Sequence, residues 1–435
     1  MDNLHRSPHL GFPTTVINLP HTEGPVASVD LTYRDPSMEH EPSRRRFLSR
    51  VSVAAGTIAL SSSPLVALAG DDAESLVWRG QRRRVSPGRR FFPQSVASFD
   101  PRADSVILWT RLQDDDHAGQ GLGLVLLVAS DIWMRRLVVA MDVTARAGDD
   151  GVVQAKLTGL HPKSHYYYRF VYEKRGRWFG SALARTRTAP AAQDSTAVRF
   201  ALTSCQDAIG RFYNTYLPLL AQEADVVVHV GDYIYETTGD PSFQSTTGRR
   251  MTFSDTAGAI ARQGAGGATY YAAQSLSNYR ELYRFYRSDP VLQRVHERFP
   301  FINIWDDHEY SDDCWGATAT YRNGSADEFN PSRRRNAERA FFEYIAVDDS
   351  GRAGGEVDLS GRPLYPDAHV YRDFRFGRNL HLLMTDYRSA RPDHLIPEDA
   401  FPGTIAVDRA ALTLLLGAQG ISYDLVKANF APYTI

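Results

Sequence analysis

The chain has 435 residues, of which 43% are hydrophobic and 23% are charged, so it is long enough for two folded domains. Its formal net charge of −2 gives no electrostatic basis for stable binding to nucleic acid or to an anionic membrane, and we expect neither partner. Both cysteines, Cys205 and Cys314, lie in stretches that carry candidate chemistry, so we expect no structural disulfide between them.

Residues 1–70 are predicted to be a leader. Residues 1–42 are polar, show no apolar period and are expected to be disordered. Three arginines at 44–46 then precede a short apolar run that ends in Ala-Leu-Ala at 67–69. A basic head, an apolar middle and an A-x-A end are typical of a signal peptide, and adjacent arginines favour the twin-arginine type. We therefore expect the twin-arginine machinery to export the protein to a periplasmic, cell-wall-associated or extracellular location.

Two segments with different patterns follow the leader. Residues 71–90 carry arginine runs and are predicted to be a solvated linker. Residues 91–190 show short alternating strands between turn residues, which is typical of a β-sandwich that serves as a scaffold or lid. The strands are expected at 105–110, 123–129, 137–143, 152–157 and 166–172. A small, polar boundary then leads into a second domain, 195–435.

Residues 199–236 predict a β-α-β unit. Short apolar runs before Cys205 and Asp232 are typical of strands, and a helical period covers 212–221. Parallel strands of such a unit end at the same edge of a sheet, so Cys205 and Asp232 should meet there. Tyr235 is a third donor in the same loop, and this mixture suits a hard or borderline metal, especially iron. Taken singly, the aspartate has a turn role and the cysteine a packing role as the alternative.

A second group of polar residues follows the apolar run 299–305. Asp306, Asp307, His308 and Glu309 are costly to bury unpaired, so a cation nearby is the natural compensation. Asp307 offers an oxygen ligand, and His308 is suited to give a proton to a departing oxygen. A solvated acidic loop is the alternative, but the position of the group at a strand end favours the metal site.

Other predicted elements surround these motifs. A loop at 237–269 is expected over the site, and a helix is expected at 279–286. The helix predicted over 332–347 begins with three arginines that either bind phosphate or are solvated. The strand predicted at 381–384 leads to Arg388, which either contacts substrate or pairs with Asp386.

Four motifs resemble those of the alkaline phosphatase D (PhoD-like) family of metallophosphoesterases. They are SCQD, GDYIYE, WDDHEYSDDCW and LLMTDYRS, and they occur in order after the twin-arginine signal and the β-sandwich. The resemblance covers about residues 43–435. It implies an α/β fold with a layered metallophosphoesterase-type β-sheet core and flanking helices, preceded by a fibronectin type III-like β-sandwich. It also implies phosphodiesterase and alkaline phosphatase activity.

The resemblance implies a role for each matching residue. Cys205 and Tyr235 would bind Fe(III), and Asp232 would bridge to a second metal, Ca(II). Asp307 would take the place that asparagine holds in the related purple acid phosphatases, with Asp306 as the alternative. His308 would fall at the proton-donor position. Zinc or manganese is the alternative metal.

The expected chemistry is hydrolysis of phosphate esters by a metal-activated hydroxide. Family members supply further metal ligands from carboxyl-terminal strands, including a histidine-bearing motif, but no histidine follows His394. We therefore expect this chain to be a fragment that lacks the carboxyl-terminal part. The alternative is a secreted binding protein that is truncated or catalytically inactive.

Overall fold

The computed structural model describes residues 73–245, 247–264, 267–319, 328–348 and 353–392, together with residues 413, 414 and 417. All of these belong to one compact unit of the chain, residues 60–435. The predicted leader and twin-arginine signal at 1–70 lie outside the described residues, as does most of the segment after residue 392. Among the described residues, no helix combines the length and the apolar character needed to cross a membrane.

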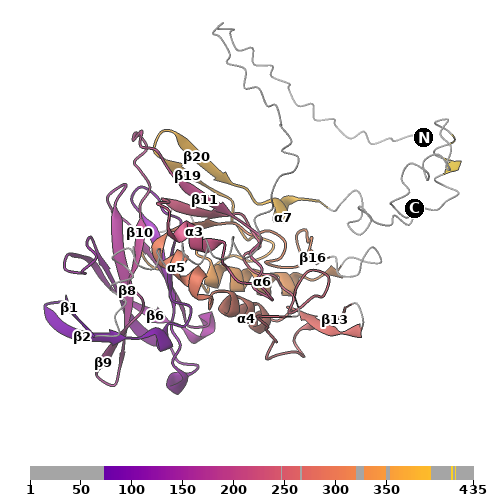
Figure 1. Cartoon of the computed structure of the whole chain (residues 1–435), viewed down its shortest axis with the longest axis horizontal. Coiled ribbons are helices and arrows are strands. Elements are labelled where there is room, and N and C mark those ends of the chain that lie inside the picture. Colours follow the sequence, from indigo (N-terminus) through magenta and orange to yellow (C-terminus); the bar gives the residue numbers. More distant parts are fainter. Residues whose placement is uncertain are drawn as a thin grey trace, which may run out of the picture. The chain divides into compact units, whose positions relative to one another are not determined.

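One seven-stranded sheet is formed by amino-terminal strands (Figure 1). The strands predicted at 123–129, 137–143 and 166–172 belong to it and are confirmed. Its order is β1 (Glu74–Trp78), β2 (Gln81–Pro87), β9 (Arg177–Gly180), β8 (His165–Lys174), β5 (Leu122–Ala129) and β6 (Leu137–Ala145), with β10 (Ala184–Arg187) paired to β8.

The prediction of a linker at 71–90 was wrong for its described part, which contains strands β1 and β2. Leu76, Trp78 and Val85 are buried in one apolar cluster with Val125 and Leu127. A strand needs an apolar residue only at every second position, so these few side chains are sufficient to hold the hairpin on the sheet. The arginines between them concealed this alternation.

A second seven-stranded sheet carries the predicted β-α-β unit. Its first four strands are parallel, and the remaining pairs are antiparallel. The order is β11 (Phe200–Thr203), β12 (Val226–His229), β15 (Phe301–Asn303), β3 (Val96–Phe99), β4 (Val106–Arg111), β7 (Val152–Leu157) and β18 (Gly355–Glu356). Both sheets contain parallel and antiparallel strand pairs. The expectation of an α/β fold with layered β-sheets is confirmed to this extent.

The second sheet crosses the predicted boundary between 91–190 and 195–435. Strand β15 pairs in parallel with β3, at Phe301 and Phe99. Next to this pair, the Asp100 amide donates a hydrogen bond to the Phe301 carbonyl oxygen at 2.8 Å. The two predicted domains therefore share one continuous sheet.

Strand β4 anchors this sheet on both of its faces. Its side chains are buried on both faces. Val106 and Leu108 pack in the cluster between the two sheets, whereas Ile107 and Trp109 pack in the cluster that includes the helices. The Trp109 indole also donates to the Glu343 carbonyl oxygen at 2.7 Å.

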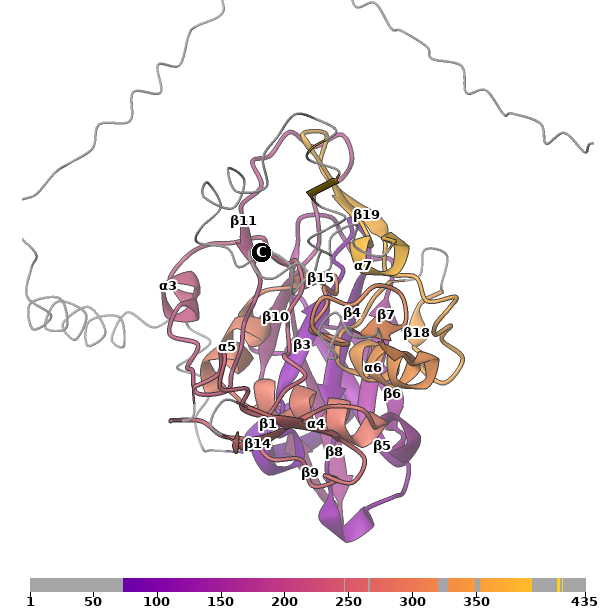
Figure 2. The same cartoon turned by 90° about the vertical axis from the view of Figure 1, so that its right-hand side faces the viewer.

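Helices α4 and α6 pack side by side against the second sheet (Figures 1 and 2). The helix predicted at 279–286 is confirmed as α4, which Ser275 caps by accepting from the Asn278 amide. The helix predicted at 212–221 is shorter, because Pro218 excludes helical backbone four residues earlier. The helices are α3 (Tyr216–Leu220), α4 (Leu276–Tyr286), α5 (Pro290–Arg298), α6 (Pro331–Tyr344) and α7 (Tyr387–Ala390), with short 3₁₀ turns η1 (Arg89–Phe91), η2 (Asp115–His117) and η3 (Ala147–Asp149).

Three two-stranded sheets complete the described elements. The strand predicted at 381–384 is confirmed as part of one hairpin, which Arg372 ties to Asp100 of the second sheet at 2.7 Å. The pairs are β13 (Ile260–Gln263) with β14 (Thr269–Ala272), β16 (Thr318–Ala319) with β17 (Glu328–Phe329), and β19 (Arg372–Phe376) with β20 (Leu380–Met384).

Two buried histidines predict acid sensitivity of the fold. Burial lowers the pKa of His229 to about 3, and burial, Arg287 and His229 lower the pKa of His296 well below its ordinary value. In the unfolded chain both histidines have pKa values of about 6.5, so they bind protons more tightly there than in the folded protein. Stability is retained above about pH 6.5 and falls below it, by roughly 1.4 kcal/mol per pH unit for each histidine, until the folded pKa is reached.

We expect His229→Gln to flatten the decline of the free energy of unfolding between pH 6.5 and 4, measured by urea denaturation. The same change at the exposed His161 is the control and should leave the slope as in the wild type. An unchanged slope in His229→Gln would contradict this assignment.

Candidate metal centre

Three loops that follow parallel strands meet at one edge of the second sheet. Strands β11 and β12 pair in parallel, as do β12 and β15, so Cys205, Asp232 and Asp307 leave the sheet on the same side. The Gln206 amide donates to the Asp232 carbonyl oxygen at 3.0 Å, which joins the first two loops. A Cβ on Gly231 would lie 2.4 Å from the Cβ of Asp306, so only glycine allows the second and third loops to approach this closely.

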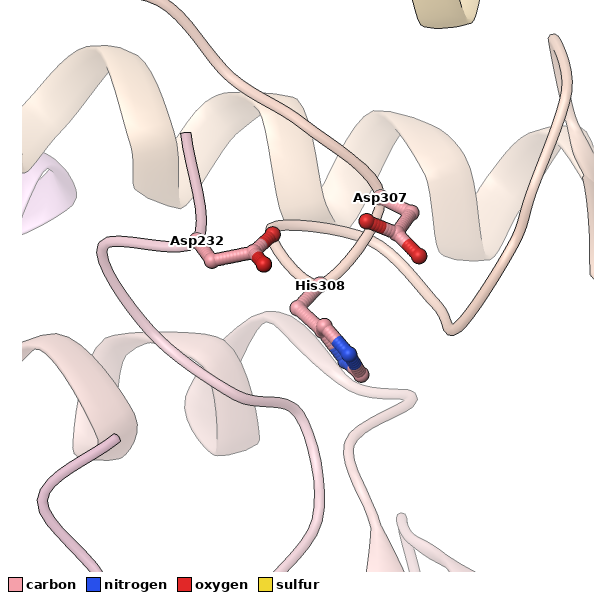
Figure 3. A group of neighbouring side chains, drawn as sticks. All are labelled: Asp232, Asp307 and His308. Carbon is pink, nitrogen blue, oxygen red and sulfur yellow. The ribbon is translucent and has the colours of Figure 1, made fainter. Parts of the chain in front are cut away.

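Figure 3 shows Asp232 on one of these loops beside Asp307 and His308 on another, with the two carboxylates turned toward each other. One ligand atom from each lies within 4.8 Å of the other two. Both aspartates are buried and the histidine is half-buried. The structure therefore brings together three of the predicted site residues.

Cys205 and Tyr235 lie beside this group, as the sequence predicted. The Tyr235 hydroxyl donates to Asp232 Oδ2 at 3.4 Å. Burial raises the pKa of the Cys205 thiol, and the charge of the nearby Asp232 raises it further. Burial raises the pKa of Tyr235, and the charges of Asp232 and Cys205 raise it further. A cation would act in the opposite direction on both groups, because it favours thiolate and phenolate. Cys205 and Cys314 are both free, as expected.

The electrostatics of Asp232 fit a bound cation. Burial raises the pKa of Asp232 to about 6; His308 opposes this rise, and the neighbouring Asp307 and Asp306 add to it. Its Oδ1 is buried without a hydrogen-bond partner, which is costly for a carboxylate. A metal ion would supply the missing partner and the missing positive charge. The nearby sulfur, phenol and carboxylate groups suit a hard or borderline metal.

His308 is held by a residue that sequence reasoning missed, Glu236. The histidine Nδ1 lies 2.7 Å from Glu236 Oε2, and its ring packs at a tilt against the Tyr235 ring, with centroids 4.1 Å apart. Burial alone would lower the pKa of His308, but Glu236, Asp307 and Asp232 outweigh it and raise the pKa well above its ordinary value. These carboxylates therefore favour the protonated form of His308. Glu236 ends the GDYIYE motif, so its acidic type was the only available signal.

Arg388 lies against the acidic loop rather than against Asp386. Its guanidinium pairs with Asp306, Asp307 and Asp313, the last two at 3.2 Å. The predicted alternative of a pair with Asp386 was wrong, since that carboxylate caps α7 and accepts from the Trp305 indole at 2.8 Å. The position of Arg388 brings one fixed positive charge to the site.

Two of the three arginines at the start of α6 are buried, whereas Arg335 is exposed. Arg333 and Arg334 are fully buried. Arg333 Nε donates to the Ala273 carbonyl oxygen at 2.9 Å, and Arg334 Nε donates to Glu338 at 2.7 Å. The expectation of a solvated run was therefore wrong for Arg333 and Arg334, which neighbouring segments cover, and is confirmed for Arg335.

A cavity of about 710 Å³ opens beside the thiol of Cys205. Tyr235 and Phe243 line one part of it, and Leu202 and Phe212 line another. Cys205 and Tyr235 thus lie where this cavity meets the polar cluster.

Comparisons with known proteins cover both sheets. Residues 200–420 match the family model described as PhoD-like phosphatase, and residues 79–190 match the model of its N-terminal domain. Alkaline phosphatase D of Bacillus subtilis (strain 168) is 32% identical over 308 residues, which are 69% of this chain and 47% of that protein.

Solved structures give a similar result. The structure of PhoD is similar with a TM-score of 0.55 and 29% identity, covering 71% of this chain and 55% of that chain. The structure of a purple acid phosphatase from yellow lupin (Lupinus luteus) seeds has a TM-score of 0.37 and 8% identity, covering 70% of this chain and 48% of that chain. This chain spans about half the length of the relatives it matches.

We expect Asp232→Asn to weaken cation binding, because the amide side chain lacks the negative charge with which the buried carboxylate attracts the cation. Titration of Ca²⁺ into metal-free protein, followed by calorimetry, should show a loss of affinity of at least about 100-fold. Asp142→Asn, on an exposed carboxylate of the first sheet, is the control and should bind as the wild type does. Equal affinity in Asp232→Asn and the wild type would remove Asp232 from the site.

Proposed function

Because the chain belongs to the PhoD-like phosphatase family, we propose that it is an exported, metal-dependent phosphodiesterase and alkaline phosphatase. The resemblance of the four sequence motifs to this family is thereby confirmed. The observation that carries the proposal is the convergence of Asp232, Asp307 and His308 within 4.8 Å, beside Cys205 and Tyr235. The proposed substrate is a phosphate ester.

The proposed cofactors are Fe(III) and Ca(II), with zinc or manganese as the alternative. Cys205 and Tyr235 would hold the iron, Asp307 would hold the second metal, and Asp232 would face both. When bound, the ions supply the Lewis acidity that ionises water for attack on phosphorus. Cys205, which is exposed, and Tyr235, which is half-buried, both line the cavity. Substrate is proposed to reach the site through this cavity.

His308 is the proposed general acid. Glu236 holds Nδ1, so Nε2 is the atom that gives a proton to the leaving oxygen. The Nε2–H bond breaks as the O–H bond of the product alcohol forms, and the neutral imidazole keeps its hydrogen bond to Glu236. Arg388 is proposed to assist substrate binding, by adding positive charge beside Asp307.

The amino-terminal strands are proposed to form a sandwich of the fibronectin type III kind. Support comes from Tyr166, whose hydroxyl accepts a hydrogen bond from the His161 amide five residues upstream at 2.9 Å. A tyrosine that bonds to nearby upstream backbone is a hallmark of corners in such sandwiches.

Export by the twin-arginine machinery is also proposed, on the basis of the arginines at 44–46 and the apolar run that follows them. The final location would be periplasmic, cell-wall-associated or extracellular. Replacing the two arginines at 45 and 46 by lysine should retain the unprocessed precursor in the cell.

We expect metal-loaded wild-type protein to hydrolyse a chromogenic phosphodiester and His308→Asn to lower kcat by about 10²- to 10⁴-fold, because the leaving alkoxide then lacks its acid. The same change at the exposed His161 should have no effect. Folded wild-type protein that binds cations but cleaves no ester would support the alternative of an inactive binding protein.

A phenolate ligand of iron should be visible by spectroscopy. We expect iron-loaded protein to show a charge-transfer band in the visible range, and Tyr235→Phe to abolish it while iron content, measured by elemental analysis, stays above half of the wild-type value. A band that survives this change would assign the colour to another residue. Stoichiometric zinc or manganese after native purification would favour the alternative metals.

A further inference from the structure

Glu309 lies directly after His308 and has no role in the chemistry described so far. Its side chain is 3% exposed. Its two carboxylate oxygens accept three backbone hydrogen bonds: Oε2 from the amides of Asp232 at 3.1 Å and Asp306 at 2.8 Å, and Oε1 from the amide of Tyr233 at 2.6 Å.

These three amides belong to two different loops. Asp232 and Tyr233 follow strand β12, whereas Asp306 follows strand β15. In both loops the strand pairing has ended. No backbone carbonyl oxygen of the described residues accepts a hydrogen bond from these three amides. Buried N–H groups need a hydrogen-bond acceptor. Glu309 provides this acceptor beyond the ends of the two strands, where strand pairing no longer does.

The position of Asp232 depends on this arrangement. Its backbone has φ of 57°, in the left-handed region, and Gly231 before it has φ of 111°. Such a backbone persists only where its surroundings fix it. The amides of Asp232 and Tyr233 in this turn donate to Glu309, and so does the amide of Asp306 in the other loop. These hydrogen bonds therefore connect the turn to the backbone that leads to Asp307.

We propose that Glu309 is a positioning residue that sets the separation between Asp232 and Asp307 by tying their two loops together. This inference rests on the proposed metal-dependent function of the site. Glutamate suits the role because both of its side-chain oxygens accept hydrogen bonds from the backbone. Glutamine would turn an NH₂ group toward backbone donors, and aspartate would fall one methylene short.

The test uses Glu309→Gln, with Glu343→Gln as a matched control. Glu343 is also a fully buried glutamate, but it accepts from Arg280 and Arg339 on helices α4 and α6. Loss of its charge should lower global stability without opening the two loops. Comparing the variants separates general destabilisation from misplacement of ligands.

We expect Glu309→Gln to weaken Ca²⁺ binding by roughly 10- to 100-fold, measured by calorimetry, and to lower kcat more than it changes KM. Hydrogen exchange should accelerate in the peptides that contain Asp232, Tyr233 and Asp306. Glu343→Gln should retain wild-type affinity and wild-type exchange in those peptides. Glu309→Asp, which keeps the charge, should change affinity and exchange in the same direction to a smaller degree.

Wild-type affinity and wild-type local exchange in Glu309→Gln would overturn the proposal. If that variant does not fold, the same two measurements on Glu309→Asp decide it, and unchanged values overturn it. A wild-type protein that neither binds Ca²⁺ nor cleaves an ester would refute the proposed function instead. In that case the exchange measurement still decides whether Glu309 holds the loops.

Discussion

The crowding of negative charge at the end of three parallel strands is the constraint on which the rest of the site depends. Asp232 and Asp307 are buried within a few ångströms of each other, where like charges repel strongly. The protein offsets this with the cation of Arg388, with the Asp313 amide, which donates to Asp307 at 2.7 Å, and with the ring of His308, whose protonated form the nearby carboxylates favour. The uncompensated oxygen of Asp232 is where a metal ion is expected to complete the balance.

The supporting sheet keeps these charges close. Strand β15, which leads to Asp307, is paired on one side with β12 and on the other with β3. Strand β4, next to β3, is anchored on both faces by the two apolar clusters. Residues 91–190 therefore contribute strands β3, β4 and β7 to the sheet that carries the site.

The sequence was informative wherever a local pattern determined the outcome. Strand ends predicted that Cys205, Asp232 and Asp307 would meet, because parallel strands deliver their following residues to one edge. Local patterns failed where contacts between distant segments decide the result. The strands β1 and β2 were concealed among arginines, and the partners of Glu236 and Glu309 lie across loops that no spacing rule connects.

Two of the proposed ligands stand on unfavourable backbone. Cys205 and Asp232 have φ values of 54° and 57°, a region where glycine is more stable than any residue with a side chain. Glycine at either position would relax the turn but leave no sulfur or carboxylate. The site therefore keeps two side chains at a cost in conformational stability. Selection for thermostability alone would favour their replacement by glycine.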